Sequence, residues 1–174
     1  AAIAQMVSNG EADIAIVTER IDDHPELSKL TCDEWNHAVI VPKEHPLLEC
    51  MNPLSIEDLA SFPLITYEFA FNQGSSIARA FNKAHLDNPD VVLSAADTDV
   101  LKTYVRLGLG VGLMAKMAFD PEKDADLELV DAAHLFEPSP IWIAVRSDTY
   151  LRGYTYDFIE MFSPKLTRDV VDRI

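Results

Sequence analysis

Residues 97–114, a segment that ends in three closely spaced glycines, constrain the fold more than any other part of the sequence. Asp97 or Thr98 can accept a hydrogen bond from a free N–H group of a first helical turn, which predicts that a helix starts there. Gly108 favours the left-handed backbone in which helices commonly end. The apolar run Val111–Met114 follows directly and predicts a short buried strand. Helix, glycine turn and strand together form half of an α/β unit.

The two faces of this predicted helix differ in character. Its apolar residues recur at helical spacing, whereas Lys102 and Arg106 share the opposite face, so we expect that face to meet water. Gly110 and Gly112 predict close backbone approach around the strand. The glycines follow a helix and precede a strand, which is the reverse of a dinucleotide-binding loop, so the sequence does not predict such a loop.

The charge of the chain bears directly on its function. The net charge is −15 at pH 7, from 14 basic and 29 acidic residues. Binding to duplex DNA requires clustered Lys and Arg that displace counterions from phosphates. The sequence therefore predicts that these residues are not themselves a nucleic-acid-binding part.

Length and composition predict a globular chain of one domain or two small lobes. The 174 residues are 48% hydrophobic, which is enough for a core, and we find no apolar run of membrane-spanning length and no signal segment. Ala1–Val7 has the pattern of the middle of a helix, so we expect the chain to be a fragment that begins inside a folded unit. Cys32 and Cys50 lie in unlike contexts without a metal-ligand pattern, as is typical of reduced cytoplasmic thiols.

Three predicted strand-to-helix corners carry the candidate binding residues. In open α/β sheets, ligands bind at the carboxyl ends of strands. Thr18 follows a predicted strand at 11–17, Thr66 lies near the end of a strand at 62–67, and Thr98 follows a strand at 91–94. The free N–H groups of residues 73–76 can bind a small anion at a helix start. The candidate ligand-binding residues are Thr18, Thr66, Asn72, Gln73 and Thr98.

Each of these assignments has a plainer structural alternative. Thr18 can be an ordinary strand-end hydroxyl, and Asn72 or Ser75 can simply cap the helix that follows. Phe69 and Phe71 can line an apolar pocket or belong to the core, and we favour the core. We expect His37 and His45 to be structural or exposed, because no partners at metal-ligand spacing accompany them.

The remaining elements complete an α/β pattern. Strands are predicted at 27–31, 37–42, 127–130 and 141–145, the last one antiparallel or at a sheet edge, and helices at 1–8, 55–59 and 150–162. A helix followed by a strand at 11–17 predicts a parallel sheet there.

Three stretches of the sequence carry a family resemblance. They are TDVLKTYVRLGLGVGLM (98–114), WNHAVIVPKEHPL (35–47) and the tyrosine-rich tail YLRGYTYDFIEMFSPKLTRDVVD (150–172). With them, nearly all of the chain resembles the effector-binding domain of LysR-type transcriptional regulators, and most of all the members that control sulfur assimilation and cysteine biosynthesis.

The resemblance implies an α/β fold class with two Rossmann-like lobes around a ligand cleft, similar to periplasmic binding proteins. It places residues 1–36 and 138–174 in lobe I, with the N-terminal part of that lobe missing, and residues 37–137 in lobe II. The threonine that matches Thr18 touches a bound anion in such proteins. Asn72 stands where they usually carry threonine, and this difference bears on ligand preference.

The resemblance also implies partners. The effector would be sulfate, thiosulfate, O-acetylserine or N-acetylserine, bound in the interlobe cleft. The full regulator would be a cytoplasmic homo-oligomer, a dimer of dimers, that contacts DNA only through an N-terminal winged helix-turn-helix outside this chain. We expect no cofactor, no metal and no membrane association.

Two other classes of function were weighed against this interpretation. A periplasmic-type solute-binding protein for an anion or amino acid has the same two-lobe plan, and a signal peptide in the full gene would favour it. An enzyme requires a nucleophile beside an oriented base. Neither Cys32 with His37 nor Ser75 with any histidine has a recognisable spacing, so we expect no catalysis.

Overall fold

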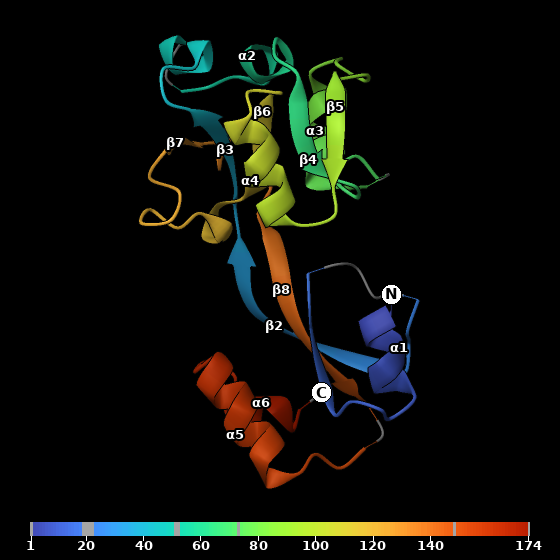
Figure 1. The fold of residues 1–174 in the computed structure, drawn as a ribbon. Helices are drawn as coiled ribbons and strands as arrows, with labels where there is room; N and C mark the ends of the chain where they lie inside the picture. Colours follow the sequence, from blue (N-terminus) through green and yellow to red (C-terminus); the bar gives the residue numbers. More distant parts are fainter. Residues whose placement is uncertain (1, 19–22, 51–52, 73, 148, 174) are drawn as a thin grey trace. The chain divides into compact units, whose positions relative to one another are not determined.

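The computed structural model describes residues 2–18, 23–50, 53–72, 74–147 and 149–173. The chain divides into two compact units. Unit 1 combines Ala1–Glu34 with Ser139–Ile174, and unit 2 is the continuous stretch Trp35–Pro138. Figure 1 traces both units along the chain.

Unit 2 is built on a five-stranded mixed sheet with the order β5-β4-β6-β3-β7. The strand bounds are β3 His37–Pro42, β4 Leu64–Tyr67, β5 Val91–Ala95, β6 Val111–Ala115 and β7 Leu127–Asp131. Strand β4 pairs in parallel with β5 and β6, and β3 pairs antiparallel with β6 and β7. The helices of unit 2 are α2 (Ile56–Ala60), α3 (Ser76–Lys83) and α4 (Thr98–Arg106), with 3₁₀ turns η1 (Pro46–Glu49) and η2 (Lys116–Ala118).

Helices cover both faces of this sheet, which is why its central strands are apolar on both sides. Phe81 of α3 packs on Leu64 and Leu113, whereas Leu101 and Val105 of α4 belong to a second cluster with neighbouring residues of the same strands. Successive strand residues point to opposite faces. The two clusters are therefore the two cores of one α/β layer structure.

Unit 1 contains a three-stranded sheet with the order β1-β8-β2. Its strands are β1 Ile14–Val17, β2 Leu27–Trp35 and β8 Ser139–Arg146, and its helices are α1 Ala2–Ser8, α5 Gly153–Phe162 and α6 Arg168–Val171. The core includes Ala4 and Val7 of α1, which pack against residues of β1 and Ala144 of β8.

The strand pairing in unit 1 corrects one expectation. The helix followed by a strand predicted a parallel sheet, but β1 pairs antiparallel with β8, Ile14 lying opposite Val145. Strand β8 is antiparallel as predicted, yet it lies between β1 and β2 rather than at an edge. The reason is that β8 comes from the far end of the chain, so no local pattern reveals it.

The helix at 97–107 and its end match the sequence prediction closely. Asp97 is the N-cap and its side chain accepts a hydrogen bond from the N–H of Val100 at 2.8 Å. Gly108 has φ +74° just after the helix, in the left-handed region that glycine adopts without strain. The short helix α2 also has the predicted start, with a capping box between Ser55 and Asp58.

Gly112 permits the tight packing between β6, β3 and α4. A Cβ atom at this position would lie 2.6 Å from Cγ1 of Ile40 and 2.7 Å from Cγ2 of Val105. We expect Gly112→Ala to lower the free energy of unfolding by about 1–3 kcal/mol, the usual cost of overpacking. Denaturant unfolding measures it, with Gly153→Ala as control, because nothing lies within 4 Å of a Cβ there. Equal stability of the two variants would contradict this account.

Candidate functional site

The carboxyl ends of β4 and β5 lie side by side in unit 2. The strands are parallel, and Tyr67 at the end of β4 is in register with Ala95 at the end of β5. The chain then enters α3 after β4 and α4 after β5. Two helices therefore begin after neighbouring strand ends on the same side of the sheet. The N-terminus of each helix carries the partly positive end of its dipole.

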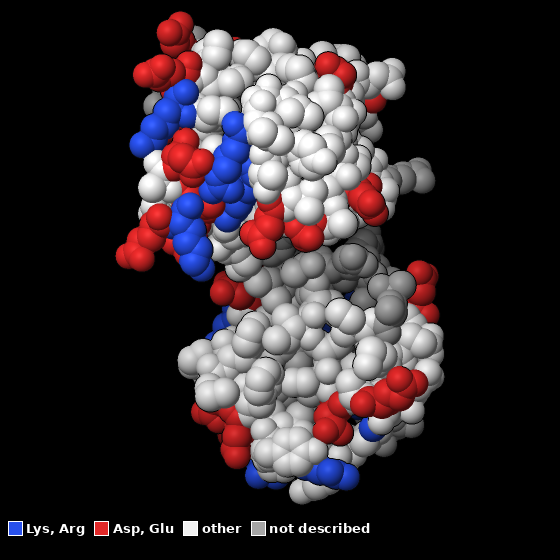
Figure 2. All heavy atoms as spheres, in the orientation of Figure 1, with Lys and Arg blue, Asp and Glu red and all other residues white. Residues whose placement is uncertain are grey.

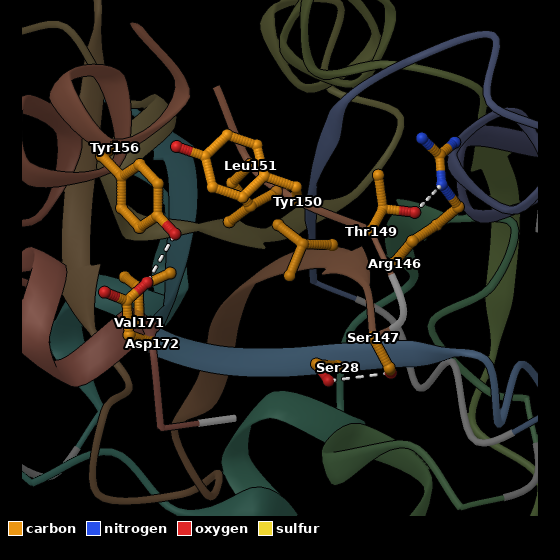
Figure 3. A pocket seen from close by; sticks show the side chains of 10 residues that line it. Ser28, Arg146, Ser147, Thr149, Tyr150, Leu151, Tyr156, Val171 and Asp172 are labelled. Atoms are coloured by element: carbon orange, nitrogen blue, oxygen red, sulfur yellow. Dashed lines mark hydrogen bonds between the residues drawn. The ribbon is translucent and has the colours of Figure 1, made fainter. Parts of the chain in front are cut away.

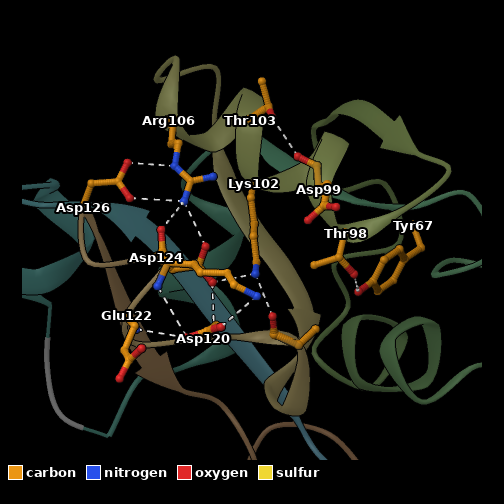
Figure 4. Close-up of polar contacts among 12 residues, drawn as sticks. Tyr67, Thr98, Asp99, Lys102, Thr103, Arg106, Asp120, Glu122, Asp124 and Asp126 are labelled. Carbon is orange, nitrogen blue, oxygen red and sulfur yellow. Dashed lines mark hydrogen bonds and ion pairs between the residues drawn. The ribbon is translucent and has the colours of Figure 1, made fainter.

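A pair of hydroxyl groups joins the two corners. The Tyr67 hydroxyl and Thr98 Oγ1 are 2.9 Å apart, within hydrogen-bond distance (Figure 4). Both residues are only partly buried, so their oxygens sit at the rim of the sheet rather than in the core. A hydroxyl both donates and accepts, which suits recognition of a small polar ligand.

An aromatic surface adjoins this pair. The rings of Tyr67 and Phe69 are nearly parallel, at an angle of 6° with centroids 5.2 Å apart. Tyr67 is the last residue of β4, and Phe69 lies in the turn that follows. Phe69 is 47% exposed, so the expectation that it belongs to the core is wrong. Phe71 does pack against the core, edge-on to Phe81.

Two of the predicted residues, Thr98 and Asn72, lie exposed or partly exposed at these corners. The side chain of Ser75, not that of Asn72, caps α3 by accepting from the N–H of Ala78 at 3.0 Å. The Asn72 amide is consequently not used as a cap, and it makes no side-chain hydrogen bond to any residue the structure describes.

The other three predicted residues differ in their surroundings. Thr66 is fully buried and its hydroxyl donates to the backbone carbonyl of Leu113 at 2.9 Å, which ties β4 to β6. Thr18 is exposed and directly follows β1 in unit 1. Gln73 lies outside the described residues. The ligand-binding roles of all five residues stay predictions.

Tyr67 is the residue at this site that sequence reasoning missed. It was assigned only as the last residue of a strand, and its hydroxyl contact with Thr98 joins residues 31 positions apart. Strand alternation gives no signal for the stacking of Tyr67 on Phe69, because Phe69 lies in a turn beyond the end of β4.

On the face of α4 that the sequence predicted to meet water, Arg106 is exposed as predicted, but Lys102 lies in a buried ion pair. The side chain of Lys102 is only 8% exposed, and its Nζ lies 2.5 Å from the carboxylate of Asp124, which is 3% exposed. Arg106 bonds both Asp124 at 2.9 Å and Asp126 at 2.7 Å (Figure 4). The prediction that Lys102 meets water is therefore wrong, because the loop before β7 covers it.

The electrostatics of this cluster favour its charged form. Burial alone would raise the pKa of Asp124, but hydrogen bonds from Lys102, the backbone N–H of Asp120 and Arg106 outweigh burial and hold that pKa below its ordinary value. Lys102 also donates to the carbonyl of Ala118 at 2.7 Å. Its charge is thus engaged within the fold and is not offered to a ligand at the other end of α4.

Within the described residues, no group of three or more His, Cys, Asp or Glu side chains is arranged to hold a metal ion. His37 is buried between the rings of Trp35 and Phe136, and burial lowers its pKa to about 4. Cys32 is buried as a free thiol that donates to the carbonyl of Ile141, and burial raises its pKa.

The surface charge agrees with the composition. On the face that Figure 2 shows, Lys and Arg side chains lie among Asp and Glu side chains rather than in a basic stripe. An anion at the strand ends would therefore be held by hydroxyl, amide and N–H groups against an overall repulsive field. None of the helices in the described part of the chain is long and apolar enough to cross a membrane.

The strand-end corner of unit 2 brings together the polar groups that could bind a small ligand. Comparison with known proteins gives the family: the LysR substrate binding domain matches residues 1–166, and the chain belongs to this family. The solved effector-binding domains of this family have the two-lobe fold of periplasmic binding proteins, as the resemblance implied.

The related proteins are regulators of transcription. The chain is 47% identical over 171 residues to the HTH-type transcriptional regulator CysB of Burkholderia cenocepacia, covering 98% of this chain and 54% of that protein. It is 48% identical over 164 residues to the regulator SsuR of the same organism, covering 94% and 53%. The chain thus spans about half the length of the curated relatives it matches.

A solved structure extends the likeness to the fold. The crystal structure of the cofactor-binding domain of the Cbl transcriptional regulator superposes with a TM-score of 0.89 at 38% identity, covering 99% of this chain and 75% of that one. The similarity to CysB and Cbl proteins confirms the resemblance to LysR-type transcriptional regulators. The relatives are regulators and not enzymes, in line with the expected lack of catalysis.

Proposed function

We propose that this chain is the effector-sensing part of a LysR-type regulator of sulfur assimilation and cysteine biosynthesis. Its effector is a sulfate-like anion, such as sulfate or thiosulfate, or O-acetylserine or N-acetylserine. The observation that carries the proposal is the corner where β4 and β5 end together, with the Tyr67–Thr98 hydroxyl pair and the uncommitted Asn72 amide. The names of the related regulators support the sulfur connection.

Neutral donors suit this class of ligand. Hydroxyl, amide and helix N-terminal N–H groups bind oxyanions without a counter-charge. Effector binding that prefers one arrangement of the regulator shifts the population toward that arrangement. We propose further that the regulator is a cytoplasmic homo-oligomer, a dimer of dimers, and contacts DNA through a winged helix-turn-helix outside these residues.

Calorimetric titration with sulfate, thiosulfate and N-acetylserine tests the effector site. We expect Thr98→Val and Asn72→Ala each to weaken binding of the preferred anion roughly tenfold, because each removes a hydrogen bond to a charged group. Thr103→Val is a matched control: Thr103 lies on the same helix, but its hydroxyl donates to the carbonyl of Asp99. Absence of binding of all three anions to the wild-type protein would refute the proposed effector class.

A further inference from the structure

Unit 1 contains a hollow that the proposed effector site does not use. It lies where β8 gives way to the segment before α5, has a volume of about 160 Å³, and is lined by Asp13, Arg146, Thr149, Tyr150, Arg152 and Thr155 among others. An adjoining hollow of about 150 Å³, seen in Figure 3, shares Arg146, Thr149 and Tyr150. Two arginines and two threonines in one small depression are the groups that bind oxyanions.

Arg146 is held in place before any ligand arrives. Its Nη1 donates to the carbonyl of Val7, near the end of α1, at 2.9 Å. Its Nε donates to Thr149 Oγ1, also at 2.9 Å (Figure 3). A Cβ atom on Gly10 would lie 2.8 Å from Nη1, so the guanidinium is packed closely under that backbone. A cation fixed in this way loses little side-chain entropy on binding an anion.

Arg152 is the second arginine that lines the hollow. Its Nη1 donates to the Tyr154 hydroxyl at 3.2 Å, and that hydroxyl donates to Asp13 at 2.9 Å. The only carboxylate among the described lining residues is thus already engaged by Tyr154. Among the described lining residues, two positive charges accompany one negative charge, in a chain of net charge −15.

Thr155 is the observation that points to a ligand. Its side chain is buried, with 3% exposure, and it lines the hollow. Among the residues described, its hydroxyl has no hydrogen-bond partner. The unpartnered side-chain atoms that are sealed from solvent in the described structure belong to Trp35 and His37, not to Thr155. Thr155 is therefore a buried lining residue whose hydroxyl has no hydrogen-bond partner among the described residues.

The start of α5 adds backbone donors next in sequence to the lining residues Arg152 and Thr155. Helix α5 begins at Gly153, and no side chain caps it. The N–H of Thr155 bonds to the carbonyl of Arg152, while no partner of the Gly153 and Tyr154 N–H groups is found in the described structure. Uncapped first-turn N–H groups at the positive end of a ten-residue helix favour an anion.

We propose that this hollow is a second anion-binding site, which takes a small oxyanion group, as in sulfate, phosphate or a carboxylate, between Arg146, Arg152 and Thr155. The site belongs to unit 1 alone and does not rest on the proposed effector function. It gives the protein a second place at which an anionic metabolite can bias its conformation.

Amide NMR titration distinguishes this site from the strand-end site. The protein is titrated with sulfate, phosphate or acetate at constant ionic strength set with chloride, and the shifts of the Gly153, Tyr154 and Thr155 amides are followed. We expect saturable shifts with at least one of the three anions. Arg152→Gln and Thr155→Val should each weaken that binding roughly threefold to tenfold, with shifts around Asn72 and Thr98 unaffected.

Arg173→Gln is the control, because it removes an exposed arginine of unit 1 that does not line the hollow. Thr155→Val keeps the shape of the side chain and is expected to fold. It therefore tests the site even if Arg152→Gln has a folding defect. Amides 153–155 that do not respond to any of the three anions would overturn the proposal. The same holds if Arg173→Gln weakens binding as much as the two site variants do.

Discussion

Replacement of Asp124 by alanine is expected to lower the free energy of unfolding by about 3–5 kcal/mol, the cost of leaving a buried charge without its partner. Asp124 accepts from both Lys102 and Arg106, and the first of these is itself buried. Removing the carboxylate leaves the Lys102 ammonium with only the carbonyl of Ala118 as a described partner. Urea or guanidinium unfolding at pH 7 measures the loss.

Two controls separate the buried pair from surface electrostatics. Asp126→Ala removes an exposed carboxylate from the same arginine and should have a much smaller effect. The double variant Lys102→Met with Asp124→Leu removes both buried charges at once, and we expect it to be far more stable than Asp124→Ala. If Asp124→Ala were no less stable than Asp126→Ala, the buried pair would not stabilise the fold.

The pH dependence of stability should be dominated, between pH 7 and 5, by His37. Burial lowers its pKa from 6.5 to about 4, so the folded state keeps the imidazole neutral while the unfolded chain takes up a proton. Its contribution to stability is complete above pH 6.5 and is lost as the pH falls toward 4. Because each pH unit inside this window is worth about 1.4 kcal/mol, we expect a loss of about 2 kcal/mol from pH 7 to pH 5.

The variant His37→Phe isolates this effect. Phenylalanine fills the space between Trp35 and Phe136 without a titrating group, and it removes the buried Nδ1 that has no hydrogen-bond partner in the described structure. The difference in unfolding free energy between wild type and variant, measured at several pH values from 5 to 8, gives the histidine contribution directly. A difference that is constant across this range would show that His37 does not titrate differently on unfolding.

Local features of the fold were predictable from sequence, because their causes are local. Asp97 caps the helix that it precedes, Gly108 ends that helix, and Ser55 forms the expected capping box. Gly110 and Gly112 were expected to allow close approach, and a Cβ on either would clash with a neighbour. Each of these sequence signals lies within a few residues of the structural feature that it predicts.

Two of the failures involve partners far away in the sequence. Lys102 was expected to meet water like its neighbour Arg106, because its buried partner Asp124, 22 residues further on, is invisible to helical periodicity. The antiparallel partner of β1 is β8, which no pattern near residue 14 reveals. Phe69 was assigned to the core on its hydrophobicity alone, although it stacks on Tyr67 at an exposed corner.

The candidate binding residues were found by position rather than by residue type. The rule that ligands bind at strand ends led to Thr98 and Asn72, which do lie at adjacent corners. It did not distinguish them from Thr66, whose hydroxyl is buried against Leu113. Whether a strand-end hydroxyl is free depends on the neighbouring strand, and that information is tertiary.

The strand order of unit 1 has a consequence for synthesis on the ribosome. Strand β8 lies between β1 and β2, so the first two strands to be made have no shared partner until residues 139–146 emerge. The whole of Trp35–Pro138, with all its own strands, is translated in that interval. Unit 2 can therefore fold before β1 and β2 pair with β8, and these two strands lack that one partner while unit 2 is being made.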